Sequence, residues 1–483
     1  MKAVITVSHT TTPGTFDALG VPIPLVASLT RSGIAAPFPI QSATLPDTLA
    51  GRDVLGRGRT GSGKTLAFAL PLVARLAGLV PSGEAIPRRS RPGHPRALVL
   101  APTRELATQI TQTVEPLAQA AGLRVMTIFG GVSQLRQVES LRRGVDIVVA
   151  TPGRLEDLMG QRQVALDSVA VTVLDEADHM ADLGFLPGVT RILKATPSGT
   201  QRLLFSATLD RGVDKLVAQF LHEPLVHSVD RAESAVTSME HHVFLVPDAA
   251  QKGEVVKALA GGTSRRLLFT RTKHQAKKLA RQLTSSGIPA VELHGNLSQN
   301  ARERGLEAFA SGDVNVMVAT DIAARGIHVD NIELVVHVDP PAEHKAYLHR
   351  SGRTARAGHG GDVVTMVLPE QRGDFKALAR AAKIDVAPTS VSAGDARVLA
   401  LVGEVAPSVR PADAPVAASR VAAPQPQVRK APRPATASRP ATGSRSATGS
   451  RSATGSRPAG SAAAFSSRRD RGRRPAAGTR RSA

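Results

Sequence analysis

The sequence has no cysteine, few aromatic residues and no long apolar run. Without cysteine there can be no disulfide framework and no thiolate-ligated metal site, which fits a reducing compartment. Aromatic residues make up only 3% of the 483 residues, but 42% are hydrophobic and 21% are charged, which is enough to build buried cores. A chain of this length is expected to form at least two domains.

The sequence also lacks a recognisable membrane span and a recognisable secretion signal. Apolar runs such as 97–101 and 146–150 have the length of a strand, far below the roughly 20 residues that cross a bilayer. The first residues, MKAVITVSHTTTPG, offer too short an apolar stretch for the core of a signal peptide. We therefore expect a soluble, cytoplasmic protein with no membrane partner.

The net charge of +21 points to a polyanionic partner, because clustered Lys and Arg release counterions from phosphate backbones. Two thirds of this excess lies in residues 408–483, where 16 basic residues face only Asp413 and Asp470. This segment is rich in Pro, Ala, Ser and Arg, and it repeats the hexapeptides SRPATG, SRSATG and SRSATG over 438–455. Such a composition buries too little apolar surface to offset the entropy of ordering, so it predicts a disordered basic tail. We expect this tail either to tether a polyanion electrostatically or to act only as a solubilising segment.

Short apolar runs alternate with helical stretches through the rest of the chain. The runs are apolar throughout, as expected for parallel strands that helices cover on both faces. They lie at 97–101, 146–150, 169–174, 202–206, 266–270, 314–319, 334–338 and 363–368. This pattern predicts an α/β fold whose ligands bind beyond the carboxyl ends of the strands.

The pattern weakens over 227–239, which is polar and has little apolar periodicity. We interpret this interruption as a linker between two domains. The predicted organisation is an N-terminal extension (1–12), a first domain (13–230), a linker (231–240), a second domain (241–388) and a disordered tail (389–483).

The segment Gly58-Arg-Thr-Gly-Ser-Gly-Lys-Thr65 has the pattern of a phosphate-binding loop, and a helical stretch follows it directly. Glycines let backbone N–H groups converge on phosphate oxygens, Lys64 neutralises phosphate charge, and the Thr65 hydroxyl is suited to Mg²⁺. The alternative, a glycine-rich turn before a helix, rarely reproduces all eight positions. The predicted nucleotide-binding residues of this loop are Thr60, Gly61, Ser62, Gly63, Lys64 and Thr65.

Four residues, Asp175-Glu-Ala-Asp178, follow the apolar run at 171–174. One carboxylate at such a place holds a metal ion, and a second takes the proton from an attacking water molecule. A solvated acidic helix cap is the alternative for this tetrapeptide alone, but the upstream phosphate loop favours the catalytic interpretation.

These motifs occur in a series that resembles the DEAD-box helicases of superfamily two, from about Phe16 to Gly361. The first part of the series comprises a Q motif within 14–42, the phosphate loop, Pro102-Thr-Arg-Glu-Leu-Ala107, Gly130-Gly131, Thr151-Pro-Gly-Arg154, Asp175–Asp178 and Ser206-Ala-Thr208. The second part comprises Leu268-Phe-Thr-Arg271, His294-Gly295, Gln299 with Arg302, Ala319–Gly326 and His349–Gly358. The resemblance implies two tandem RecA-like parallel-sheet domains and an RNA-stimulated ATPase that unwinds or remodels RNA.

The resemblance also implies the roles of the residues that handle ATP. Gln41 would read the adenine edge and Phe16 would pack on its ring, while Lys64, Thr65 and Asp175 would bind phosphates and Mg²⁺. Glu176 would activate water. Gly326, Arg353 and Arg356 would complete the site from the second domain, with both arginines stabilising charge in the transition state. Five further residues would couple hydrolysis to RNA: Asp178, Ser206, Thr208, Asp321 and His349.

A further set of residues is expected, by resemblance, to line an RNA groove across both domains. Loops and helix N-termini suit contacts to phosphate and sugar, so recognition should be sequence-tolerant and RNA should be preferred through its 2′-hydroxyl groups. The expected partner is single-stranded or short duplex RNA, with ribosome-assembly or RNA-decay proteins as the class of protein partner. The set comprises Pro102, Thr103, Arg104, Gly130, Gly131, Thr151, Gly153, Arg154, Arg271, Gln299, Arg302 and Thr320.

One position departs from the family pattern. His328 stands where these helicases usually have Asp near the ATP ribose. We expect weaker or pH-sensitive ATP coupling, unless other positions compensate. This departure also keeps open an alternative function, an RNA-binding scaffold with a decayed ATPase, against which the intact Lys64, Glu176 and arginines argue.

Overall fold

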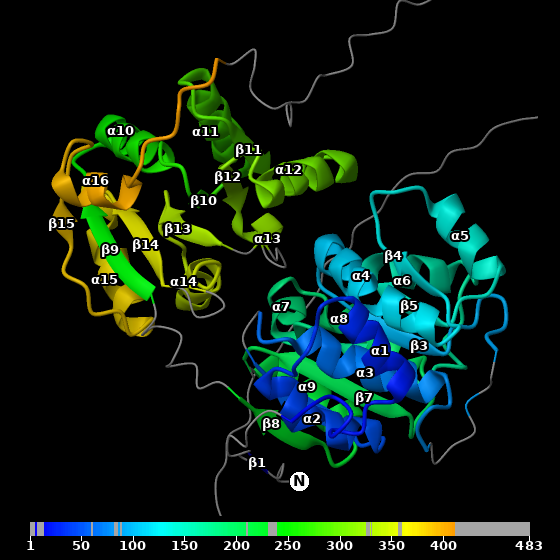
Figure 1. Cartoon of the computed structure of the whole chain (residues 1–483). Coiled ribbons are helices and arrows are strands. Elements are labelled where there is room, and N and C mark those ends of the chain that lie inside the picture. The colour runs from blue at the N-terminus through cyan, green and yellow to red at the C-terminus, as the bar shows by residue number, and fades with distance from the viewer. Residues whose placement is uncertain are drawn as a thin grey trace, which may run out of the picture. The chain divides into compact units, whose positions relative to one another are not determined.

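The computed structural model describes residues 5–6, 14–58, 61–81, 86, 89–208, 211–229, 239–324, 329, 331–355 and 360–410 (Figure 1). They form two α/β lobes, each built on one parallel sheet. Among these residues, no helix is both long enough and apolar enough to pass through a membrane. The expected N-terminal extension, linker and tail lie mostly outside the described residues.

The first lobe has an eight-stranded sheet in the order β1-β8-β2-β7-β6-β3-β5-β4, and every pair is parallel. Its strands are β1 (Ile5–Thr6), β2 (Val54–Arg57), β3 (Ala97–Leu100), β4 (Val125–Ile128), β5 (Ile147–Ala150), β6 (Val171–Leu174), β7 (Gln201–Ser206) and β8 (Leu225–Ser228). Its helices are α1 (Ile23–Arg31), α2 (Pro39–Leu49), α3 (Lys64–Leu76), α4 (Arg104–Ala120), α5 (Gln134–Arg142), α6 (Pro152–Gly160), α7 (Ala177–Asp182), α8 (Leu186–Lys194) and α9 (Arg211–Phe220).

The second lobe has a seven-stranded parallel sheet in the order β11-β12-β10-β13-β14-β9-β15. Its strands are β9 (Met239–Leu245), β10 (Arg265–Thr270), β11 (Ala290–Leu293), β12 (Val316–Thr320), β13 (Ile332–His337), β14 (Gly361–Val367) and β15 (Thr389–Ser390). Its helices are α10 (Ala249–Ala260), α11 (Lys273–Ser285), α12 (Gln299–Ser311), α13 (Asp321–Ala324), α14 (His344–Ser351), α15 (Arg372–Ala381) and α16 (Ala396–Val402), with a 3₁₀ turn, η2, at Pro369–Gln371.

Both faces of each sheet are buried, which explains why the central strands are apolar throughout. Along β3, Ala97 and Val99 join one core cluster with residues of α1, α3 and α4. The alternate residues Leu98 and Leu100 join a second cluster with residues of α5, α6, α8 and α9. Successive side chains of a strand point to opposite faces, so in a strand that helices cover on both faces every side chain is buried and apolar residues are favoured.

Two of the predicted boundaries are wrong. The expected linker (231–240) ends too late, because Met239 and Glu240 already belong to β9. The expected tail (389–483) begins too early, because β15 and α16 belong to the second lobe. Buried Arg266 donates a hydrogen bond from Nη2 to the carbonyl of Val402 at 2.6 Å, so this segment satisfies a cation of the core. Residues 411–483 lie outside the described part of the chain.

The strand register determines where the motifs lie. In the first sheet Arg57 of β2 pairs with Ser206 of β7, and Leu100 of β3 pairs with Leu174 of β6. The segments that follow these residues therefore leave the same edge of the sheet. They carry the phosphate loop, Pro102–Ala107, Asp175–Asp178 and Ser206–Thr208.

Candidate nucleotide and RNA site

The phosphate loop joins β2 to α3 through left-handed glycines. Gly61 has φ +88° and Gly63 has φ +87°, and Gly63 is the N-cap of α3. A Cβ atom at Gly63 would lie 2.6 Å from Nε2 of Gln41 and 2.9 Å from the ring of Phe38, so glycine is required there. The Nζ of Lys64, a buried group, donates a hydrogen bond to the carbonyl of Gly58 at 2.8 Å. Predicted residue Thr60 lies outside the described residues.

Gln41 fixes this loop to the preceding helix. Its Oε1 accepts a hydrogen bond from the backbone N–H of Phe38 at 2.9 Å, and its Nε2 donates to the carbonyl of Gly63 at 2.8 Å. The side chain is wholly buried, so both ends of the amide serve the backbone in this structure. Phe16, the predicted partner of the adenine ring, is 2% exposed and packs with the core of the first lobe.

Asp175 and Glu176 are buried side by side at the end of β6, yet their acidities differ. Burial raises the pKa of Asp175 to about 7 against the attraction of Lys64, and the neighbouring Glu176 carboxylate adds to the increase. Burial also opposes ionisation of Glu176, but a hydrogen bond from His179 and the charges of Lys64 and Arg353 hold its pKa well below its usual range. Two adjacent carboxylates with different pKa values are suited to different roles.

These groups fit a bound Mg²⁺ ion. Carboxylate and hydroxyl oxygens are the ligands that Mg²⁺ accepts, and Asp175 and Thr65 supply one of each beside the phosphate loop. A divalent cation would also relieve the unfavourable burial of Asp175 among other carboxylates.

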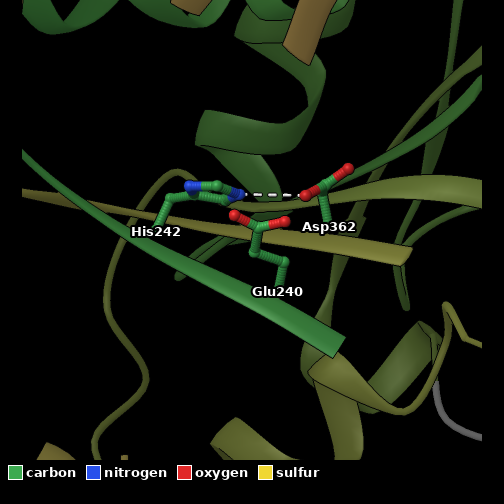
Figure 2. Close-up of side chains that lie close together, drawn as sticks. All are labelled: Glu240, His242 and Asp362. Atoms are coloured by element: carbon green, nitrogen blue, oxygen red, sulfur yellow. Dashed lines mark hydrogen bonds and ion pairs between the residues drawn. The ribbon is translucent and has the colours of Figure 1, made fainter. Parts of the chain in front are cut away.

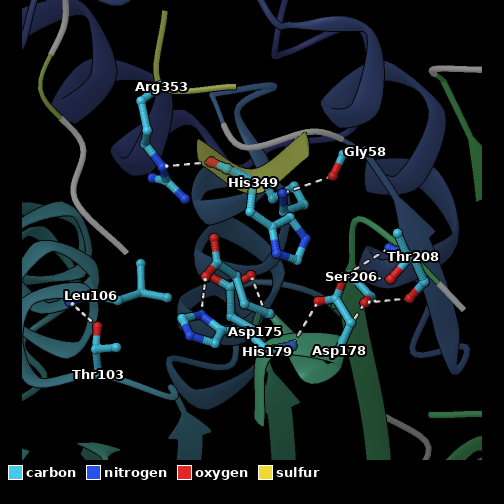
Figure 3. Close-up of polar contacts among 12 residues, drawn as sticks. Gly58, Thr103, Leu106, Asp175, Asp178, His179, Ser206, Thr208, His349 and Arg353 are labelled. Atoms are coloured by element: carbon cyan, nitrogen blue, oxygen red, sulfur yellow. Dashed lines mark hydrogen bonds and ion pairs between the residues drawn. The ribbon is translucent and has the colours of Figure 1, made fainter. Parts of the chain in front are cut away.

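Asp178 links the end of β6 to the end of β7. Its Oδ2 accepts hydrogen bonds from the backbone N–H and the hydroxyl of Thr208, at 2.9 and 2.8 Å (Figure 3). The backbone N–H of Asp178 donates to the hydroxyl of Ser206 at 3.3 Å, and this hydroxyl donates to the carbonyl of Thr208 at 2.7 Å. The structure thus brings together three of the five residues that were predicted to couple hydrolysis to RNA.

The predicted RNA residues of the first lobe gather at the starts of helices. Thr103 is the N-cap of α4, where its hydroxyl accepts a hydrogen bond from the N–H of Leu106 at 3.2 Å, and Thr151 is the N-cap of α6. Nε and Nη1 of Arg154 are buried with no hydrogen-bond partner among the described residues. Helix N-termini, and a guanidinium whose only described partner is Oδ2 of Asp157 at 3.9 Å from Nε, favour an anion such as a phosphate. Pro102, Arg104 and Gly153 lie in the same loops and first helical turns, and Gly130 and Gly131 lie in the loop between β4 and α5.

In the second lobe, the predicted residues are largely engaged with protein groups. Nε of Arg302 and Nε2 of Gln299 donate to Oε1 of Glu105 at 2.7 and 3.4 Å. Arg271 donates to Asp339 through its backbone N–H at 3.1 Å, and Thr320 ends β12.

The coupling and arginine residues of the second lobe are also partly described. Asp321 accepts a hydrogen bond from Nη2 of Arg350 at 2.7 Å. Buried Arg353 donates from Nε to the carbonyl of His349 at 3.3 Å (Figure 3). Gly326, His328 and Arg356 lie outside the described residues.

Sequence reasoning missed three partners in these networks. His179, Glu105 and Arg350 each bind a predicted residue, namely Glu176, Arg302 and Asp321. For His179 a signal was present, because a residue three positions after Glu176 lies on the same helical face. The other two pairs join segments far apart in sequence, so spacing carries no such signal.

A separate group of metal-ligand types lies at the starts of β9 and β14. Ligand atoms of Glu240, His242 and Asp362 lie within 4.8 Å of one another (Figure 2). Nε2 of His242 is 2.9 Å from Oδ1 of Asp362, and Glu240 is exposed. The His242–Asp362 hydrogen bond already engages the imidazole nitrogen that would bind a metal, so we interpret the group as a surface ion pair.

Comparison with known proteins agrees with this geometry. Residues 38–216 match the DEAD/DEAH box helicase family and residues 251–358 match the helicase conserved C-terminal domain. RNA helicase CrhR of Synechocystis is 38% identical over 75% of this chain and 71% of its own length, and ATP-dependent RNA helicase RhlB of Pseudomonas syringae is 40% identical over 67% and 81%. Dbp5 of S. cerevisiae, solved bound to RNA and ADP BeF3, superposes with a TM-score of 0.68 at 27% identity, covering 80% of this chain and all of that one. The chain therefore belongs to the family of DEAD-box ATP-dependent RNA helicases.

Proposed function

We propose that this chain hydrolyses ATP in response to RNA and uses the cycle to separate short RNA duplexes and to remodel RNA–protein complexes. The arrangement around α7 carries this proposal. Glu176, the candidate base, and Asp178, which binds Ser206 and Thr208, lie at the start of one six-residue helix. Only Ala177 separates Asp178 from Glu176 in the chain. A shift of the segment that follows β7 is therefore transmitted through Asp178 to Glu176, the residue that would activate water.

Each group has a defined task in hydrolysis. Thr65 and Asp175 would hold Mg²⁺, which neutralises charge on phosphate oxygens when bound. Lys64 exchanges its neutral acceptor, the Gly58 carbonyl, for a phosphate oxygen, which is a stronger charged acceptor. Glu176 is ionised across the physiological range because its pKa is lowered, so it is ready to take a proton from water. Arg353 and Arg356 stabilise charge that develops in the transition state.

RNA binds through its backbone in this proposal. The loops and helix starts at Thr103, Thr151 and Arg154 donate to phosphates, which carry no base identity. Arg271, Gln299, Arg302 and Thr320 continue the path on the second lobe. Binding is therefore sequence-tolerant. We also propose that the protein acts in the cytoplasm, with ribosome-assembly or RNA-decay proteins as partners.

A duplex-release assay tests this function. We expect the purified protein with ATP and magnesium to release a short labelled RNA strand from its complement, and the Glu176→Gln variant to bind the duplex without releasing the strand. RNA binding without ATP hydrolysis would favour the scaffold alternative. RNA-stimulated hydrolysis without strand release would restrict the function to remodelling of RNA–protein complexes.

A further inference from the structure

The imidazole of His179 contacts the candidate catalytic base directly. Nδ1 of His179 lies 3.1 Å from Oε2 of Glu176, and the two side chains are only 5% and 10% exposed. Glu176 is the N-cap of α7 and His179 lies in the first turn of that helix, three residues later. Neither the phosphate loop nor the RNA contacts account for a histidine at this position.

The surroundings of the ring determine which nitrogen carries the proton. Oε2 of Glu176 is a carboxylate oxygen and only accepts, so Nδ1 must donate to it. Nε2 of His179 is buried and has no hydrogen-bond partner among the described residues. A proton on Nε2 would leave a buried donor unsatisfied, whereas a bare lone pair is less costly to bury. The arrangement therefore places a hydrogen on Nδ1, directed at the carboxylate of Glu176.

The backbone holds both partners of this hydrogen bond. Glu176 has φ +50°, a left-handed conformation that is strained for a side-chain-bearing residue and that occurs preferentially at functional sites. Its N–H donates to Oδ1 of Asp175 at 3.0 Å. The N–H of His179 donates to Oδ1 of Asp178 at 3.0 Å, and its carbonyl accepts from Leu183 at 3.1 Å. The imidazole is thus joined by only two rotatable bonds to a backbone that is hydrogen-bonded at its N–H and its carbonyl, while the carboxylate sits on a side chain with three rotatable bonds.

We propose that His179 is a positioning residue, which holds the Glu176 carboxylate in the orientation from which it accepts a proton from the attacking water. The inference deepens the proposed function and rests on it. Catalytic groups depend on such alignment, because a misplacement of about 1 Å can reduce turnover by about a hundredfold. His179 does not itself contact the reacting atoms, and its contribution passes through Glu176.

Two matched variants separate positioning from general packing. In His179→Asn, the side-chain amide nitrogen occupies the place of Nδ1 and preserves a donor to Glu176. In His179→Gln, the amide lies one bond further out, near the place of Nε2, and the donor is lost. We expect RNA-stimulated kcat to fall about tenfold to a hundredfold in His179→Gln and to stay within about threefold of the original in His179→Asn. The KM for ATP and the thermal midpoint should stay close to the original in both variants.

A double-variant cycle tests whether His179 acts through Glu176. Under single-turnover conditions, adding His179→Gln to Glu176→Gln should cause little further loss, because groups that act as a unit are not additive. The proposal would be overturned if kcat fell equally in His179→Asn and His179→Gln. It would also be overturned if the fall in rate of the double variant equalled the product of the falls in His179→Gln and Glu176→Gln. A raised KM for ATP accompanied by a lowered thermal midpoint would overturn it too, since that result indicates a packing role.

A measurement on the unaltered protein keeps this test separate from that of the proposed function. The ¹⁵N NMR signals of His179, assigned by their absence in His179→Asn, should show hydrogen on Nδ1. Hydrogen on Nε2 with a bare Nδ1 would exclude the hydrogen bond to Glu176. If RNA failed to stimulate ATP hydrolysis while the Nδ1–H tautomer was observed, the proposed function would fail and the contact would stand without a catalytic role.

Discussion

At Gly63, the phosphate loop turns into α3 with a backbone that only glycine adopts without strain. We predict that Gly63→Ala weakens ATP binding by at least about tenfold. The left-handed conformation costs a side chain about 1–2 kcal/mol, and we expect the phosphate loop to relax away from its binding conformation to relieve this strain; regaining that conformation then opposes ATP binding, and 1.4 kcal/mol corresponds to a tenfold change in affinity. The added methyl group would also displace Gln41 from the carbonyl of Gly63. Titration with a fluorescent ATP analogue measures the effect.

Gly78 provides the matched control for this prediction. It also has a positive φ, +67°, but a Cβ atom there meets nothing within 4 Å. Gly78→Ala should therefore share the backbone strain and leave ATP binding unchanged. Equal losses of affinity in the two variants would show that strain alone, and not the contact with Gln41, explains the result.

The site residues differ in how far sequence could specify them. Lys64, Asp175 and Asp178 follow strands in a recognisable pattern, and the structure brings their segments to one edge of the first sheet. Phe16 is less well specified: its spacing from the Q motif predicts a contact with adenine, and in the structure the residue packs with the core of the first lobe. Whether an aromatic ring faces a ligand or a core depends on tertiary packing, which spacing does not encode.

At the scale of elements, the sequence predicted the central strands and missed the outer or more polar ones. Strands β3, β5 and β6 are fully buried and, apart from Thr172, apolar, and β7 is fully buried with an apolar centre over 203–205, so they stand out from their surroundings. Strand β4 lies at the edge of its sheet and is mostly half-buried, and in β9 the first residue, Met239, is followed by Glu240, His241 and His242. These strands are specified by pairing with neighbours rather than by their own composition.

Strand β13 ends at a buried histidine that makes the stability of the second lobe depend on pH. Burial, together with the charge of Arg350, holds the pKa of His337 well below 6.5. The unfolded chain therefore binds this proton more readily than the folded chain, so stability is full above about pH 6.5 and is lost as the pH falls below it. We predict a loss of about 1 kcal/mol from this residue between pH 7.5 and pH 5.5.

Thermal unfolding of the full chain at several pH values tests this prediction against His337→Gln, which cannot titrate. The midpoint of the original protein should fall more steeply between pH 7.5 and pH 5.5 than that of the variant. Parallel pH curves would show that His337 is not responsible for the dependence. The half-buried neighbour His241, whose pKa is lowered mainly by its partial burial, contributes in the same direction and is present in both proteins.

At the scale of the whole molecule, the boundary between the folded lobe and the basic sequence lies later than composition predicts. The second lobe extends to at least Val409, because Val391, Val398 and Val402 are buried in it and the backbone N–H of Val409 donates to the carbonyl of Gly287 at 2.9 Å. Composition alone placed this boundary too early, since six of the seven residues over 387–393 are Ala, Pro, Thr or Ser. The burial of the three valines and the hydrogen bond from Arg266 to the carbonyl of Val402 hold this segment in the second lobe despite that composition.

Two truncations separate these parts. Removal of 411–483 should leave the thermal midpoint unchanged and should raise the RNA concentration for half-maximal ATPase activity at low salt, because most of the basic excess is lost. Removal of 389–483 should in addition lower the midpoint, because Arg266 loses a buried acceptor and the core of the second lobe is opened. If removal of 411–483 left the RNA concentration for half-maximal ATPase activity unchanged, the tail would have no role in RNA binding.

The measurement that tests the central claim most directly is steady-state ATP hydrolysis by the full chain with no nucleic acid, with single-stranded RNA and with single-stranded DNA. The account predicts strong stimulation by RNA, little by DNA, and loss of the stimulated rate in Glu176→Gln. RNA binding without stimulated hydrolysis, or equal stimulation by DNA, would contradict it.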